Sequence, residues 1–140
     1  MQTNNEMVLS FPALSQNEAF ARVAVAAFVA HLNPTVNEIT DIKTAVSEAV
    51  TNAIIHGYEG SYGWVNLKCK IVDRNIHIEI SDEGKGIDDI DKAREPLYTS
   101  KPEMERSGMG FTVMETFMDN MVVISELGKG TKIKMSKCLA

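Results

Sequence analysis

The chain has 140 residues, of which 44% are hydrophobic, enough for one compact domain with a core around a small-ligand site. Its formal charge is -5 and its pI is near 5.2, so no large positive field exists and direct DNA binding is not expected. Cys69 and Cys138 lack the spacing of a zinc site or a disulfide framework, and no apolar run approaches ~20 residues. We therefore expect a single soluble, cytoplasmic domain over residues 1–140.

Two helices are expected in the first half of the chain, after a short strand at Glu6 to Phe11. Ser15-Gln16-Asn17-Glu18 and Thr35-Val36-Asn37-Glu38 both fit the capping box, in which a hydroxyl side chain and a Glu three residues later cap a helix start. The first helix should run to about Leu32. The second has apolar residues at helical spacing and should end at Gly57.

Strands are expected over most of the second half. Residues 64–71 and 76–80 alternate apolar and polar around the turn Asp73-Arg74-Asn75, which indicates an antiparallel hairpin. A third helix fits Gly110 to Met118. Two further strands follow it, at residues 121–126 and 131–138. The order β, α, α, β, β, loop, α, β, β predicts an α+β sandwich, with helices on one face of a sheet.

A carboxylate and an amide share one face of the second helix. Glu48 and Asn52 are four residues apart, so their side chains can point into one cleft. No residue at i±3 or i±4 gives Glu48 a basic partner, which weakens but does not exclude its interpretation as a surface salt-bridge residue. Asn can bind Mg²⁺ through its oxygen, while Glu can accept a proton from an attacking hydroxyl or water. Alone, such a pair lies on an ordinary surface more often than in a site.

A second carboxylate ends the second strand of the hairpin, in Ser81-Asp82-Glu83-Gly84-Lys85-Gly86. Adenine has an exocyclic amino donor where guanine has a carbonyl acceptor, so Asp82 would favour ATP over GTP. Gly84 and Gly86 would let a planar ligand approach the backbone closely. For this segment alone an ordinary turn is the more frequent explanation, because Asp and Gly are the usual turn residues.

The start of the third helix is rich in glycine, in Arg106-Ser107-Gly108-Met109-Gly110. Backbone N–H groups at such a helix start can bind phosphate, and Lys101 and Arg106 add positive charge. The spacing is neither a P-loop nor a dinucleotide fingerprint. The nucleotide interpretation therefore depends on the conjunction of the three segments in one domain.

Taken together, the three segments resemble the motifs of the GHKL superfamily of ATPases and kinases. Glu48 to Gly57 resembles the N box, Asp82 to Gly86 the G1 box and Ser107 to Gly110 the G2 box. The resemblance covers essentially the whole chain. It implies the Bergerat fold, a two-layer α+β sandwich with a mixed, mainly antiparallel sheet, and an ATP lid at about 88–110. The N-box sequence, the lid segment Pro96 to Pro102 and the run Glu105 to Phe111 are most similar to the anti-sigma F factors of endospore-forming bacteria, with RsbW-type stress-response kinases next.

The resemblance implies one cleft that binds ATP and Mg²⁺. Glu48 would be the general base, Asn52 the Mg²⁺ ligand and Asp82 the acceptor of the adenine amino group. A larger set would enclose the rest of the nucleotide: Gly84, Gly86, Thr99, Ser100, Lys101, Arg106, Ser107, Gly108, Met109, Gly110 and Thr131.

The resemblance also implies partners. Such a kinase phosphorylates a serine of a STAS-domain anti-anti-sigma factor and otherwise inhibits a sigma factor as a homodimer. Arg22 matches an arginine implicated in partner contact, although a solvated helix charge is the ordinary explanation. The chain has no room for an appended phosphoaccepting domain, so we expect the acceptor to be another molecule. A nucleotide-gated binding module with negligible kinase activity and a stand-alone ATPase remain the alternatives.

Overall fold

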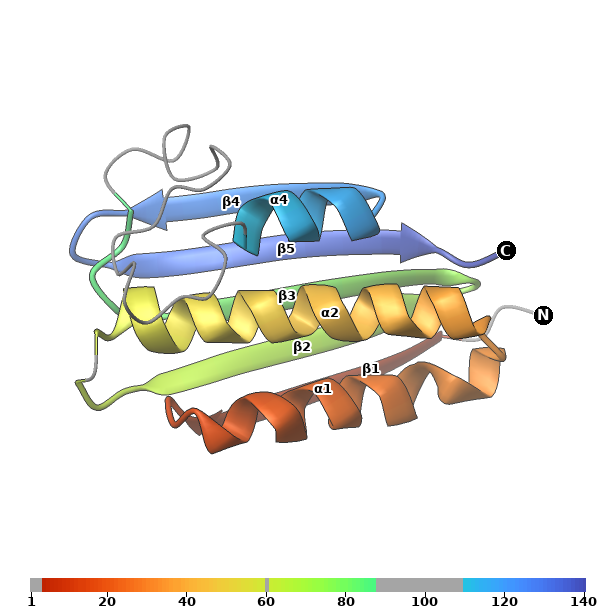
Figure 1. Cartoon of the computed structure of the whole chain (residues 1–140), viewed down its shortest axis with the longest axis horizontal. Helices are drawn as coiled ribbons and strands as arrows, with labels where there is room; N and C mark the ends of the chain where they lie inside the picture. The colour runs from red at the N-terminus through yellow and green to blue at the C-terminus, as the bar shows by residue number, and fades with distance from the viewer. Residues whose placement is uncertain (1–3, 60, 88–109) are drawn as a thin grey trace.

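A computed structural model describes residues 4–59, 61–87 and 110–140, and it places helices on one face of a sheet (Figure 1). In these residues the sheet has five strands, in the order β1-β2-β3-β5-β4. The strands are β1 (Asn4–Pro12), β2 (Trp64–Val72), β3 (Asn75–Asp82), β4 (Asn120–Glu126) and β5 (Gly130–Cys138). The predicted α+β sandwich is confirmed. All pairings among the described strands are antiparallel, so within them the sheet is not mixed.

Within the described residues, the helices are α1 (Gln16–Val29), α2 (Val36–Asn52) and α4 (Gly110–Phe117). A 3₁₀ turn, η1 (Ala30–Leu32), follows α1, and a π-helical turn, η2 (Ala53–Gly57), follows α2. Helix α2 lies between α1 and α4 over the middle of the sheet (Figure 1). The predicted helix ends at Leu32 and Gly57 are therefore confirmed, although the last turns are not α-helical. No helix in the described ranges combines the length and the apolar content needed to cross a membrane.

The core lies between α2 and the inward-facing residues of the central strands. Alternate residues of β2 and β3 point toward the helices, as the predicted alternation required. Each Val or Ile that is fully buried contributes about 1.5–3 kcal/mol to stability. The fully buried residues of α2 are Ile42, Ala45, Val46, Ala49 and Val50. This packing fixes α2 against the sheet. It therefore also fixes Glu48 and Asn52, which are half-buried on the same helix.

One of the two predicted capping boxes forms. The Thr35 hydroxyl accepts a hydrogen bond from the Glu38 N–H at 3.1 Å, and the Glu38 carboxylate accepts one from the Thr35 N–H at 2.8 Å. Ser15 instead has helical backbone angles, and its side chain caps no N–H among the described residues. Glu18 accepts a hydrogen bond from the Ser47 hydroxyl on α2. The predicted capping box at Ser15 was wrong, because Ser47, which is distant in sequence, binds the Glu18 carboxylate that the box would have used.

This difference predicts different costs for two similar substitutions. Thr35→Ala should lower the free energy of unfolding by about 1 kcal/mol, because it removes a formed cap. Ser15→Ala is the matched control and should change stability by less than about 0.5 kcal/mol. Urea unfolding followed by circular dichroism measures both. Equal losses in the two variants would contradict the assignment of a single formed box.

Candidate functional site

The described candidate residues lie toward one end of the sandwich. The C-terminal end of α2, the end of β3 and the β4–β5 turn lie at the same end of the molecule (Figure 1). Glu48 and Asn52 are one turn apart on α2, and both are half-buried. Asp82 ends β3 and is paired with Thr131 on β5. Gly110 begins α4, which packs against α2. The fold thus brings the segments that resemble the N box and the G1 box together.

The predicted lid lies almost entirely outside the described residues. Of the range 88–110, Gly110 alone is described. The predicted phosphate residues that fall outside are Thr99, Ser100, Lys101, Arg106, Ser107, Gly108 and Met109. Their place around the phosphates stays a prediction.

Asp82 is a buried carboxylate held by main-chain donors. Asp82 is only 6% exposed, and its Oδ1 accepts a hydrogen bond from the Gly84 N–H at 2.9 Å. Burial raises the pKa of Asp82 to about 6, while the N–H groups of Gly84 and Thr131 oppose that shift. A carboxylate in this position is an acceptor that gains from a further hydrogen-bond donor. An adenine amino group is such a donor.

Glycines surround Asp82 because several backbone segments approach it closely. A Cβ on Gly57 would lie 2.8 Å from the Asp82 carboxyl carbon, and one on Gly130 would lie 2.1 Å from the Asp82 carbonyl oxygen. A Cβ on Gly84 would lie 2.0 Å from the Gly57 carbonyl oxygen. Gly86 has a φ of 76°, and its Cβ would lie 2.2 Å from the last carbonyl oxygen of β4. The two G1-box glycines therefore admit neighbouring protein backbone, where the sequence suggested a ligand.

The loop after β3 is held by hydrogen bonds on both sides. The Lys85 N–H donates to the Gly57 carbonyl at 2.8 Å, and the Glu83 N–H donates to the Tyr58 hydroxyl at 2.8 Å. From the β4–β5 turn, the Gly128 N–H donates to the Lys85 carbonyl at 2.5 Å. The sequence indicated Gly57 as a helix end and as the last residue of the N-box resemblance, but it gave no indication of Tyr58 beyond its position directly after that glycine.

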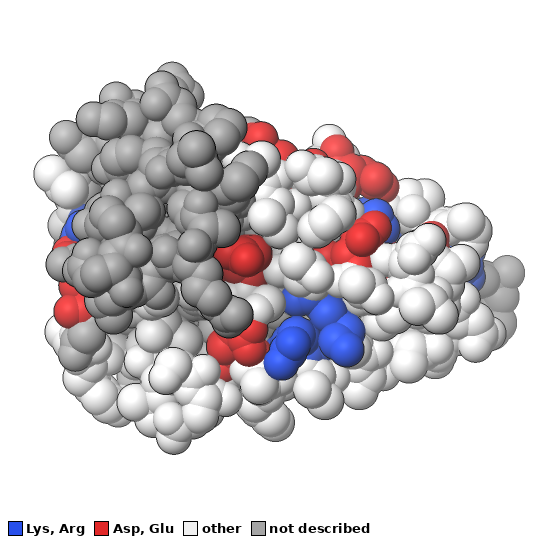
Figure 2. Space-filling view, in the orientation of Figure 1, with Lys and Arg blue, Asp and Glu red and all other residues white. Residues whose placement is uncertain are grey.

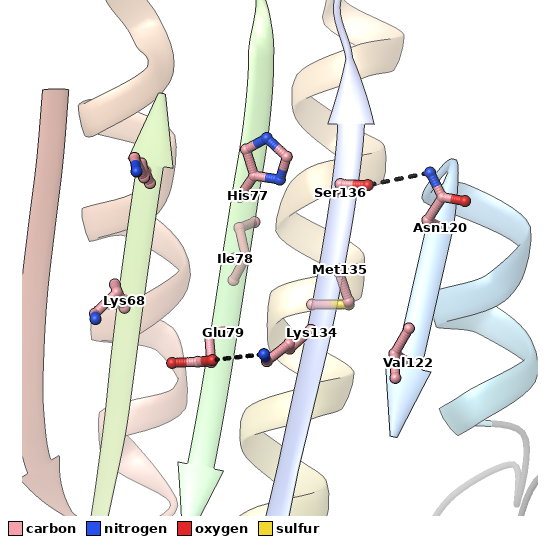
Figure 3. Close-up of a pocket in the computed structure, with 10 residues that line it drawn as sticks. Lys68, His77, Ile78, Glu79, Asn120, Val122, Lys134, Met135 and Ser136 are labelled. Atoms are coloured by element: carbon pink, nitrogen blue, oxygen red, sulfur yellow. Dashed lines mark hydrogen bonds and ion pairs between the residues drawn. The ribbon is translucent and has the colours of Figure 1, made fainter. Parts of the chain in front are cut away.

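A hollow of about 280 Å³ lies on the face of the sheet that no described helix covers (Figure 3). The Glu79 carboxylate there lies 3.9 Å from the Lys132 ammonium and 3.8 Å from that of Lys134. Asn120 donates a hydrogen bond to the Ser136 hydroxyl at 3.2 Å. Polar and charged side chains that pair across strands are typical of the solvated face of an antiparallel sheet. The lining contains none of the predicted site residues, so this hollow is separate from the candidate cleft.

Comparisons with known proteins agree with this geometry. The sequence model of the histidine kinase-like ATPase domain matches residues 11–137. An anti-sigma F factor of Clostridium botulinum (strain Eklund 17B) is 63% identical over 134 residues, which are 95% of this chain and 94% of the relative. One from Oceanobacillus iheyensis is 61% identical over 137 residues, covering 97% and 94% of the two chains. The chain belongs to the anti-sigma F factor family. The predicted resemblance is thereby confirmed, as is its histidine kinase-like ATPase domain.

A solved structure supports the fold of this family member. The RsbU and RsbW domains of Rv1364c from Mycobacterium tuberculosis match with a TM-score of 0.70 and 18% identity. The match covers 96% of this chain and 32% of that longer one. At this identity the likeness shows the fold alone. The family's domain is that of an ATPase, so nucleotide binding is the chemistry to test at the Asp82 end of the sheet.

The burial of Asp82 predicts a pH dependence of stability in this anti-sigma F factor relative. Its folded pKa of about 6 lies above the ordinary value of 3.8, so between these values the folded state holds a proton that the unfolded chain has lost. Asp82 therefore removes stability as the pH rises through that window. Asp82→Asn should lessen this loss, measured by urea unfolding at several pH values. Glu83→Gln, at the adjacent exposed residue, is the control; a parental pH profile in Asp82→Asn would contradict the assignment.

Proposed function

We propose that this protein is an ATP-dependent serine protein kinase and an anti-sigma factor. It phosphorylates a STAS-domain anti-anti-sigma factor and otherwise binds and inhibits a sporulation sigma factor. The observation that carries the proposal is the buried carboxylate of Asp82, 6% exposed, at the end of β3 and beside the end of the helix that bears Glu48 and Asn52. Membership in the anti-sigma F factor family supports both halves of the proposal.

The residues present suit the proposed chemistry. Asp82 accepts the adenine amino group at one end of the cleft. Glu48 takes the proton of the acceptor serine while the serine oxygen bonds to the γ-phosphorus. The bond from that phosphorus to the β–γ bridging oxygen breaks, and ADP leaves. Transfer of this kind depends mainly on positioning and on charge stabilisation, so the docked acceptor decides whether a serine or water receives the phosphoryl group.

Asn52 is the proposed Mg²⁺ ligand, through its amide oxygen. Mg²⁺ commonly takes one or two protein ligands and completes its shell with waters and substrate phosphates. Within the described residues, no three His, Cys, Asp or Glu side chains gather into a metal site. A single amide at the cleft fits an ion that enters together with the nucleotide. When bound, the ion neutralises charge on the phosphates.

A phosphotransfer assay tests the kinase proposal. Purified protein, Mg²⁺ and γ-labelled ATP should label a serine of a cognate STAS-domain protein. Glu48→Ala should lower transfer by roughly 10²–10⁴-fold and keep ATP binding, because the base acts in the chemical step. Thr44→Ala is a matched control one turn earlier on α2, since among the described residues its hydroxyl donates to the Thr40 carbonyl of its own helix.

Three results of this assay would contradict the proposal in different ways. A verified acceptor that stays unlabelled although ATP binds would favour the nucleotide-gated binding module. Rapid phosphate release without any partner would favour the stand-alone ATPase. A loss of ATP binding in Glu48→Ala equal to its loss of transfer would remove the role of Glu48 as base.

The proposed partner surface lies on α1. Phe20 and Val23 are 56% and 58% exposed there. Arg22 lies 3.8 Å from the Glu18 carboxylate, and its buried Nε has no hydrogen-bond partner among the described residues. Figure 2 shows basic side chains gathered on the helix-covered face where α1 and α2 run side by side; the basic residues of those helices are Arg22 and Lys43. Exposed apolar side chains beside a positive charge suit a protein partner with complementary acidic groups.

The oligomeric state and the partner can be tested together. We expect light scattering after size exclusion to give the mass of a homodimer at micromolar concentration, and a larger complex when a sigma F-type factor and ATP are added. Arg22→Ala should weaken the complex at least tenfold, because it removes a charge from the contact. Arg74→Ala, in the β2–β3 turn, is the control. A monomeric mass would contradict the homodimer, and parental affinity in Arg22→Ala would contradict its role.

A further inference from the structure

The chain leaves α2 through a π-helical turn. In η2 (Ala53–Gly57), the Tyr58 N–H donates to the Ala53 carbonyl at 3.2 Å, five residues back. Such wide turns are rare and are frequent at functional sites, because they change which way the following residues point. Here the turn is followed by two contacts with the end of β3. Gly57 lies against the Asp82 carboxyl, and Tyr58 enters the core with 9% of its surface exposed.

The Tyr58 hydroxyl joins two main-chain segments that are distant in sequence. It donates to the Trp64 carbonyl at 2.6 Å, at the start of β2, and accepts from the Glu83 N–H at 2.8 Å. A Cβ on Gly63 would lie 2.2 Å from the Tyr58 ring, so the ring is tightly packed against this turn. Packing of this kind holds the hydroxyl in one place. Since both partners are backbone groups, the hydroxyl fixes backbone position.

We infer that Tyr58 is a positioning residue for the adenine end of the nucleotide site. The Glu83 N–H belongs to the peptide unit that begins with the Asp82 carbonyl, so holding this N–H orients the backbone that carries the Asp82 carboxylate. The Gly57 carbonyl holds the loop two residues further on, through Lys85. Gly57, the last residue of the π-helical turn, and Tyr58, the residue after it, therefore set where Asp82 points. This inference rests on the proposed ATP site and adds a residue that acts on it indirectly.

The placement of Tyr58 defines what its hydroxyl should affect. Tyr58→Phe keeps the ring and removes only the bridge, which leaves the Glu83 N–H and the Trp64 carbonyl to find other partners. The backbone at Glu83 would then be less restrained, and the Asp82 carboxylate would be held less firmly at the proposed adenine contact. Affinities for ATP and for ADP should therefore fall by the same factor, because the two nucleotides differ only at the phosphate end. Transfer at saturating ATP should stay at the parental rate.

Calorimetric titration of ATP and ADP, each with Mg²⁺, tests this on the full chain. We expect Tyr58→Phe to weaken both roughly three- to tenfold, the range for one lost hydrogen bond. Tyr62→Phe is the matched control, because Tyr62 is 77% exposed, lies four residues later, and should bind as the parent does. Urea unfolding of each variant shows that the folded state is populated during the titration.

A double-mutant cycle separates positioning from a general loss of structure. If Tyr58 acts through Asp82, the penalty of Tyr58→Phe should largely vanish in an Asp82→Asn background, which already lacks the full acceptor. Additive penalties would overturn the inference. So would parental affinity in Tyr58→Phe. Absence of ATP binding in the parent would instead contradict the proposed function, so the two failures are distinguishable.

Should Tyr58→Phe fail to fold, hydrogen exchange in the parent protein provides the second measurement. The Glu83 amide should exchange slowly, because the Tyr58 hydroxyl accepts its hydrogen bond, and ATP should slow it further by stabilising the loop. The neighbouring exposed segment at Ser61 and Tyr62 should show no such change on adding ATP. Rapid exchange of the Glu83 amide that ATP leaves unaltered would overturn the inference.

Discussion

The contact between the Asp82 carboxyl and Gly57, at the end of the turn η2 that follows α2, is the constraint on which the proposed cleft depends. A Cβ on Gly57 would lie 2.8 Å from that carboxyl, so the helix end and the strand end approach as closely as backbone allows. A second close approach, of Gly130 to the Asp82 carbonyl, adds the start of β5. Strand β3, strand β5 and helix α2 are thereby fixed around one buried charge. Burial of that charge is costly, and main-chain donors offset part of the cost.

Helix α2 carries this constraint to the rest of the cleft. Its buried residues, from Ile42 to Val50, pack without solvent exposure against the core. Glu48 and Asn52 lie on the same helix before the π-helical turn, and Gly57 ends that turn against Asp82. A packed helix changes length very little, so the spacing between the proposed catalytic end and the proposed adenine end is set by residue count. Helix α4, which packs on α2, places Gly110 on the same frame.

Local patterns predicted most of the fold, and contacts distant in sequence account for what they missed. The alternation in β2 and β3 and the apolar spacing of α2 were sufficient, because each element buries one face. The motif at Ser15 and that at Thr35 look alike, yet only Thr35 caps its helix, since Ser47 engages Glu18. The glycines of the G1 box were predicted to admit a planar ligand, whereas neighbouring protein backbone approaches them. This backbone belongs to β4 and η2, and no local sequence pattern predicts that these elements lie beside the G1 box.

Burial of Asp82 also explains how the proposed site would select its nucleotide. An exposed carboxylate is satisfied by water and discriminates little between ligands. A buried one, with its pKa raised to about 6, gains from any donor that favours its ionised form. An adenine amino group supplies that donor, whereas a guanine carbonyl would place an acceptor against an acceptor and add to the cost. Part of the stability that the protein loses by burying Asp82 would be regained as affinity for adenine. The proposed preference for adenine would therefore follow from the same contact that holds η2 against the end of β3.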